Sequence, residues 1–155
     1  MLIYLVRHGE AVNQIEDTAR PLSKKGEKDI RGIADLLSHQ FILMPGYIYH
    51  SPKLRAVQTA SIISKALAQT PAPVEADNLL PMDDPAVWAE RLEVADRDTM
   101  LVGHLPYMSR LVSLLLLWDA GREILNFSPG TVVCLEKTGG WRLKWMISPD
   151  ILKSP

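Results

Sequence analysis

The fold of this chain is decided by its first stretch, Leu2-Ile3-Tyr4-Leu5-Val6-Arg7-His8-Gly9. Five apolar residues are typical of a short buried strand, and an arginine, a histidine and a glycine follow at once. Open α/β sheets bind their ligands at the carboxyl ends of their strands. A histidine there can attack a phosphorus atom, an arginine can hold phosphoryl oxygens, and a glycine lets the backbone approach an anion. The stretch therefore indicates a phosphoryl-binding sheet edge.

Strand and helix patterns alternate along the rest of the chain. Ser23 is placed to cap a helix, Asp84 with Pro85 is typical of an N-cap and a first-turn proline, and Pro106 similarly predicts a helix start. A further apolar face at helical spacing runs from Leu54 to Leu67. The strands that we expect lie at residues 2–6, 47–50, 74–75, 99–103, 131–136 and 141–147.

This order of elements predicts the fold class. The first four strands alternate with helices, which is typical of a mostly parallel sheet covered on both faces. The last two flank Thr138-Gly139-Gly140, a hairpin signal, so the C-terminal edge should be antiparallel. We expect an α/β fold, a three-layer α/β/α sandwich that forms a single domain over residues 1–155, because this length suits one core.

Composition argues against several classes of function. The net charge of −1 gives no reason to expect nucleic-acid or membrane binding, and the longest apolar stretch, residues 111–118, is shorter than the roughly 20 residues of a membrane helix. Cys134 is the single cysteine, which excludes an internal disulfide and favours a buried strand thiol. No metal-binding motif and no signal-peptide pattern is present, so we expect a cytoplasmic protein without metal or cofactor.

Four side chains fall at or just past the ends of expected strands: Arg7, His8, Arg55 and His104. Because parallel strands place their carboxyl ends on one edge, we expect these side chains to converge there. Two guanidinium groups can grip a phosphoryl group, and nearby arginines should lower the pKa of His8, leaving it neutral for attack. His104, if protonated, would add a cationic donor. A phosphohistidine at His8, later hydrolysed by water, would divide one difficult step into two.

These residues resemble the histidine phosphatase superfamily, also called phosphoglycerate-mutase-like, and the short chain resembles its SixA-type phosphohistidine phosphatase branch. The resemblance is carried by VRHGEA at residues 6–11, RPLSKKG at 20–26, SPKLRAVQT at 51–59 and VGHLP at 102–106, with a weaker match at 145–149. It implies a phosphoglycerate-mutase-like fold. It also implies that His8 is the nucleophile and that Arg7, Arg55 and His104 form the phosphate pocket.

Other positions leave alternatives open. Arg20 either reaches the mouth of the pocket or is a plain surface arginine, and Ser51 either donates to phosphate or only ends its strand. Many members of the family carry an asparagine where this chain has Gln14, with Asn13 just before it, so neither has an assigned role. Many also use an acidic residue as general acid. Asp83 is the candidate for that role, whereas Asp84 is explained as a helix cap.

A site without a strong general acid favours P–N over P–O cleavage, because an alkoxide leaving group needs a proton in the transition state and an imidazole can leave as a neutral ring. We therefore expect a phosphohistidine phosphatase acting on a phosphorylated protein, such as a histidine phosphotransfer domain. The first alternative is a phosphatase of a small phosphorylated metabolite. The second is a non-catalytic phosphate-binding or docking module, against which the two histidines and two arginines argue.

Overall fold

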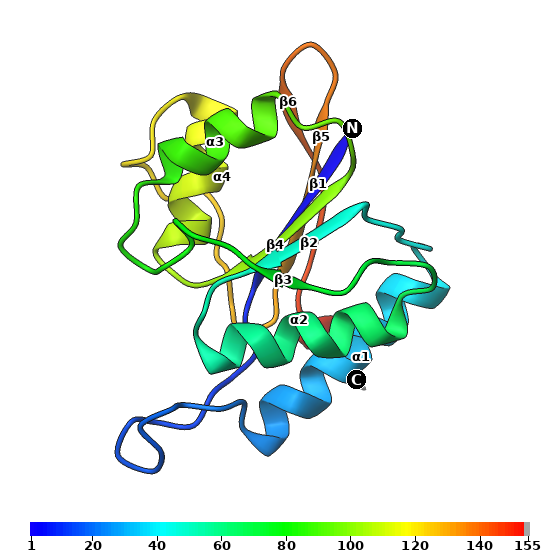
Figure 1. Cartoon of the computed structure of the whole chain (residues 1–155), viewed down its shortest axis with the longest axis vertical. Helices are drawn as coiled ribbons and strands as arrows, with labels where there is room; N and C mark the ends of the chain where they lie inside the picture. Colours follow the sequence, from blue (N-terminus) through cyan, green and yellow to red (C-terminus); the bar gives the residue numbers. More distant parts are fainter. Residues whose placement is uncertain (154–155) are drawn as a thin grey trace.

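Six strands form one mixed sheet in the computed structural model, which describes residues 1–153 (Figure 1). The order across the sheet is β3-β2-β4-β1-β5-β6. The first four pair in parallel, whereas β5 is antiparallel to both β1 and β6. The expected mostly parallel sheet with an antiparallel C-terminal edge is therefore confirmed. The strands are β1 (Leu2–Arg7), β2 (Tyr47–His50), β3 (Val74–Glu75), β4 (Thr99–Gly103), β5 (Val132–Lys137) and β6 (Trp141–Ile147).

Helices cover both faces of the sheet and complete the expected three layers (Figure 1). On one face α1 packs against α2, and on the other α3 packs against α4. A short 3₁₀ helix, η1, follows the last strand and packs on α1. The bounds are α1 (Lys24–His39), α2 (Leu54–Ala66), α3 (Pro85–Glu93), α4 (Tyr107–Leu117) and η1 (Pro149–Leu152).

The central strand β1 contributes to both cores. Tyr4 and Val6 pack with α1 and α2, while Ile3 and Leu5 pack with α3 and α4. A strand buried on both faces needs apolar side chains in succession, which is why its pattern is continuous rather than alternating. Cys134 is buried on the same face as Tyr4, and burial raises the pKa of its thiol to about 12. The cysteine is therefore an inert part of the core.

Two of the expected helix caps are present. The Ser23 hydroxyl accepts the Gly26 backbone N–H at 3.0 Å, and the Asp84 carboxylate accepts the Ala86 N–H at 3.0 Å. The start of α4 differs by one residue from the expectation. Pro106 occupies the N-cap position and the helix begins at Tyr107, because the Pro106 carbonyl accepts the Arg110 N–H at 3.0 Å as the cap of the first turn. None of the helices within residues 1–153 is long and apolar enough to cross a membrane.

Candidate active site

The main expected site residues lie at or just past the carboxyl ends of three neighbouring parallel strands, β2, β4 and β1. The loops after these strands are joined by backbone hydrogen bonds at the sheet edge. The His8 N–H donates to the Gly103 carbonyl at 2.9 Å, and the Ser51 N–H donates to the Val102 carbonyl at 3.1 Å. Residues 8, 51 and 104 therefore lie side by side although they are distant in the sequence.

His8 is 8% exposed, and its two ring nitrogens have different surroundings. Its Nδ1 lies 2.7 Å from the carbonyl oxygen of Gly9, and because a carbonyl only accepts, Nδ1 carries the proton. Nε2 is left with a lone pair, and Arg55 Nε donates to it at 3.3 Å. The ring is thus held in the tautomer that a nucleophilic Nε2 requires.

The turn after β1 is tied to α2 through Thr59. The Gly9 N–H donates to Thr59 Oγ1 at 3.1 Å, and the same hydroxyl donates to the Arg55 carbonyl at 2.8 Å. A side chain at Gly9 would come within 2.7 Å of Ile30, so only glycine lets the turn pack this closely. The sequence reasoning missed Thr59. The available signal was a hydroxyl on the otherwise apolar buried face of α2.

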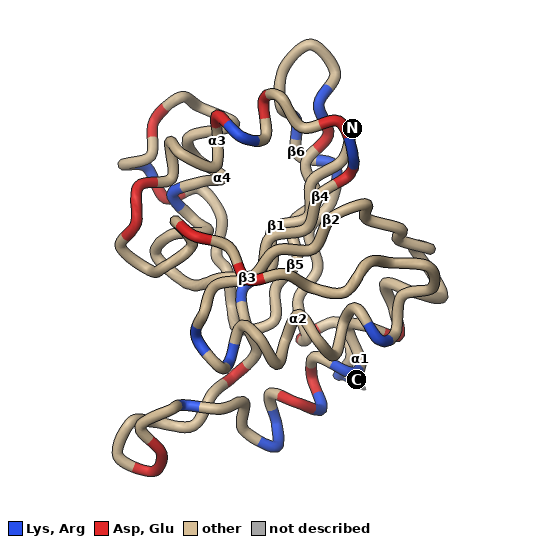
Figure 2. The backbone as a smooth tube through the Cα atoms, viewed as in Figure 1, with Lys and Arg blue, Asp and Glu red and all other residues tan. Residues whose placement is uncertain are grey.

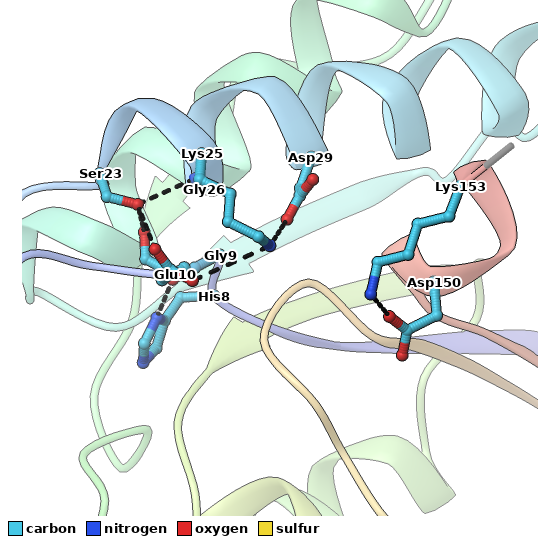
Figure 3. Close-up of polar contacts among 9 residues, drawn as sticks. All are labelled: His8, Gly9, Glu10, Ser23, Lys25, Gly26, Asp29, Asp150 and Lys153. Carbon is cyan, nitrogen blue, oxygen red and sulfur yellow. Dashed lines mark hydrogen bonds and ion pairs between the residues drawn. The ribbon is translucent and has the colours of Figure 1, made fainter.

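Glu10 and Ser23 fix the start of α1 against the same turn (Figure 3). The Ser23 hydroxyl donates to Glu10 Oε1 at 2.8 Å, and the Ser23 N–H donates to the Glu10 carbonyl at 2.9 Å. A Cβ atom at Gly26 would overlap the Glu10 carbonyl, which explains the glycine in the first turn of the helix. Lys25 bridges Glu10 and Asp29. These contacts give Glu10 a structural role beside His8.

Two residues expected to bind phosphate carry buried nitrogens without a hydrogen-bond partner. Arg7 Nη1 donates to the Phe127 carbonyl at 2.6 Å, but Arg7 Nε has no partner, and neither has His104 Nδ1. Within residues 1–153, four buried side-chain polar atoms lack a partner, and these are two of them. An unpaired buried donor costs about 1–3 kcal/mol. A ligand that accepted hydrogen bonds from these nitrogens would remove that cost.

The electrostatic environment keeps both histidines uncharged. Burial, followed by the charges of Arg55, Arg7 and Arg20, lowers the pKa of His8 to about 4, although the Gly9 carbonyl opposes this shift. Burial is thus the larger cause, and the arginines that the sequence pointed to are the smaller one. Burial, followed by His8, Arg55, Lys53 and Arg20, lowers the pKa of His104 to about 3. In the free protein at neutral pH, His104 is therefore a neutral ring rather than the cationic donor considered from the sequence.

Positive charge gathers at this end of the sheet. Figure 2 shows Lys and Arg positions at the start of α2, close to the end of β1. Arg20, whose Nε donates to the Val12 carbonyl at 3.1 Å, is near enough for its charge to lower the pKa of His8, Arg55 and His104. Lys53 acts similarly on His104 and was missed, although it lies within the SPKLRAVQT block. A cationic sheet edge with a neutral histidine suits an incoming phosphoryl group.

Residues 3–81, just over half of the 155 residues, match the family model of the histidine phosphatase superfamily (branch 1). The chain belongs to this superfamily. The search of curated proteins found no sequence that matches this chain.

Solved structures show a similar fold. The protein histidine phosphatase SixA, complexed with tungstate, is 26% identical with a TM-score of 0.84, over 99% of this chain and 100% of that one. A SixA-type protein from Agrobacterium tumefaciens is 24% identical with a TM-score of 0.78, over 96% and 97%. A mutant phosphoserine phosphatase from Entamoeba histolytica, bound to phosphoserine, is 14% identical with a TM-score of 0.75, over 98% and 99%. The fold is therefore the expected phosphoglycerate-mutase-like one.

Three other residues weighed from the sequence, Asp83, Asn13 and Gln14, lie in loops. Asp83 Oδ2 accepts the Leu80 N–H at 2.8 Å, and its backbone carbonyl accepts from Arg110 at 3.3 Å, so Asp83 closes the turn before α3. Asn13 Oδ1 accepts the Glu16 N–H at 2.8 Å, which shapes the loop before Arg20. Gln14 is exposed in that loop. Within residues 1–153, no hydrogen bond joins Asp83, Asn13 or Gln14 to His8 or His104.

Proposed function

We propose that this protein is a phosphohistidine phosphatase that removes phosphate from a phosphorylated protein through a covalent intermediate at His8. The observation that carries the proposal is the His8 ring, held by the Gly9 carbonyl at Nδ1 with the lone pair of Nε2 beside Arg55. A neutral imidazole fixed in this way is prepared for in-line attack on phosphorus. A histidine that only bound phosphate would act as a donor and would need its proton on the nitrogen that meets the oxygens.

The reaction follows from these positions. His8 Nε2 forms a bond to phosphorus as the P–N bond to the substrate imidazole breaks, and the imidazole leaves with the bonding electron pair. The guanidinium groups of Arg7 and Arg55 hold the phosphoryl oxygens as charge redistributes. The Gly9 carbonyl accepts from the Nδ1–H of the His8 ring, which becomes cationic when Nε2 is phosphorylated. Water then attacks the phosphohistidine, which releases orthophosphate and restores neutral His8.

The leaving group favours a phosphohistidine substrate. An imidazole leaves as a neutral ring when its other nitrogen is protonated, whereas an alkoxide needs a proton from the enzyme. The acidic candidate, Asp83, uses a carboxylate oxygen to accept the Leu80 N–H. The similarity to SixA, at 26% identity over nearly the full length of both chains, supports the same substrate class. A histidine phosphotransfer domain is a substrate of this kind.

A second candidate is a phosphatase of a small phosphorylated metabolite. It is favoured by the phosphoserine phosphatase from Entamoeba histolytica, which shares the fold and whose structure contains phosphoserine. In this alternative Asp83 would act as general acid for an ester oxygen. The two functions therefore differ in the substrate bond that is cleaved and in the need for an acid.

The test is a side-by-side rate comparison on a phosphohistidine-bearing protein and a panel of phosphate monoesters, with His8→Ala as the control. We expect fast release from phosphohistidine, slow ester cleavage, and no turnover by a folded His8→Ala variant. Faster cleavage of the esters would favour the metabolite phosphatase. A radiolabelled phosphoryl donor should also label the wild type on His8 but not the variant. Phosphate binding without labelling or turnover would instead indicate a docking module.

A further inference from the structure

We propose that Ser51 is a positioning residue that holds His104 in the tautomer with its proton on Nδ1, so that Nδ1–H serves as a donor to the bound phosphoryl group. The proposal rests on the proposed function in one respect, which is that the phosphoryl group binds at the sheet edge that holds His8, Arg55 and His104. It assigns Ser51 a role other than the two considered from the sequence, a direct phosphate donor or a plain strand end.

The hydrogen bonds of the Ser51 hydroxyl determine its direction. Ser51 is fully buried and His104 is 1% exposed, and Ser51 Oγ lies 2.5 Å from His104 Nε2. The Lys53 N–H donates to the same oxygen at 3.2 Å. A hydroxyl has one proton and two lone pairs. The Lys53 N–H uses one of the lone pairs, so the proton of the Ser51 hydroxyl is free to be donated to His104 Nε2. Nε2 then accepts, and the ring proton lies on Nδ1.

The opposite arrangement is less favourable. If Nε2–H donated to Ser51, the serine proton would be buried without an acceptor, and the lone pair on His104 Nδ1 would also be unpaired. The proposed arrangement leaves only Nδ1–H without a partner. Because each unsatisfied buried polar group is costly, the hydroxyl favours the Nδ1–H tautomer.

The tautomer matters because the ring is uncharged. Burial, and after it the charges of His8, Arg55, Lys53 and Arg20, lowers the pKa of His104. A neutral imidazole has a single N–H. If that proton were on Nε2, Nδ1 would carry a lone pair and could only accept a hydrogen bond. The His104 ring centre lies 5.1 Å from that of His8, the residue proposed to attack phosphorus. A donor at Nδ1 would stabilise a phosphoryl oxygen, whereas a lone pair there would repel it.

The test reads the tautomer directly by NMR of protein labelled with ¹⁵N-histidine, without any substrate. We expect wild-type His104 to show a protonated Nδ1 and an unprotonated Nε2. In Ser51→Ala the two tautomers should mix, and orthophosphate, as the probe, should bind about tenfold more weakly, the effect of losing one oriented donor. Ser113→Ala is the matched control, because Ser113 carries a buried hydroxyl without a partner on α4. It should change neither readout.

Two results would overturn the proposal. The first is a wild-type ring with its proton on Nε2, which needs no variant and so does not depend on the folding of Ser51→Ala. The second is a Ser51→Ala variant with an unchanged ring spectrum and unchanged orthophosphate affinity. Neither result depends on which phosphorylated substrate is cleaved. A failure of this proposal is therefore distinguishable from a failure of the proposed function.

Discussion

Arg55 Nε lies 3.3 Å from His8 Nε2, so in the free protein the guanidinium group is hydrogen-bonded to the nitrogen that we propose as the nucleophile. The contact is long for a hydrogen bond and is weak. An arriving phosphoryl group offers the guanidinium stronger, charge-assisted partners. In the proposed mechanism, Arg55 releases the His8 lone pair as it binds the phosphoryl oxygens, which couples binding to activation.

Replacing Arg55 with alanine should lower kcat/KM by about 10²–10³-fold, the effect of losing one preorganised donor in the transition state. Arg7→Ala should cause a loss of the same order. The measurement is steady-state turnover of a phosphohistidine protein. Arg142→Ala, which removes an exposed arginine on β6, is the matched control and should retain full activity. Unchanged turnover in Arg55→Ala would remove Arg55 from the site.

The pH dependence of the His8 charge should follow from its environment. Because burial and three arginines lower the pKa of His8 to about 4, its ring should stay neutral between about pH 5 and 8, where an ordinary histidine titrates. NMR titration of the ring nitrogens in the free protein measures this. A midpoint near the usual value of about 6.5 would contradict it. Arg55→Ala should raise the midpoint only partly, because burial is the larger cause.

Stability should depend on pH through the same two histidines. Their pKa values are about 4 and about 3 in the folded protein and about 6.5 in the unfolded chain, so between these values the unfolded state binds more protons. The free energy of unfolding should therefore fall as the pH drops below about 6.5. Urea unfolding measures how far the free energy of unfolding falls between pH 7 and pH 5. In His8→Ala this fall should be smaller than in the wild type, by on the order of 1–2 kcal/mol. An identical difference in wild type and variant would count against the burial of a neutral His8.

The sequence identified strand ends but not the contacts between them. The apolar run of residues 2–6 predicted a short buried strand, and the known geometry of parallel sheets then placed His8 and His104 at one edge. The hydrogen bond between Ser51 and His104 could not be predicted from the sequence, because it depends on the orientation of two side chains after their strands end. Lys53 was missed for a similar reason, since its effect on His104 depends on distance rather than pattern.

Activity should survive a chelator. No group of three or more His, Cys, Asp or Glu side chains is arranged to hold a metal ion within residues 1–153, and the proposed mechanism uses guanidinium groups where other phosphatases use cations. Turnover before and after dialysis against EDTA measures this, with readdition of Mg²⁺ or Zn²⁺ as the control. A loss restored by one of these metals would contradict the mechanism.

Asp83→Asn separates the two candidate functions by the bond that is broken. Asparagine retains a side-chain oxygen that can accept the Leu80 N–H, so the turn before α3 should persist while the acid is lost. In a phosphohistidine phosphatase the imidazole leaves without a proton from Asp83, so cleavage of phosphohistidine should change less than about threefold, as expected when no general acid is involved. In a metabolite phosphatase, cleavage of a phosphate monoester should fall by about 10²–10⁴-fold, the usual contribution of a general acid. Measuring both rates on one preparation of the variant, alongside Asp84→Asn as the control for a helix cap, shows which bond requires Asp83.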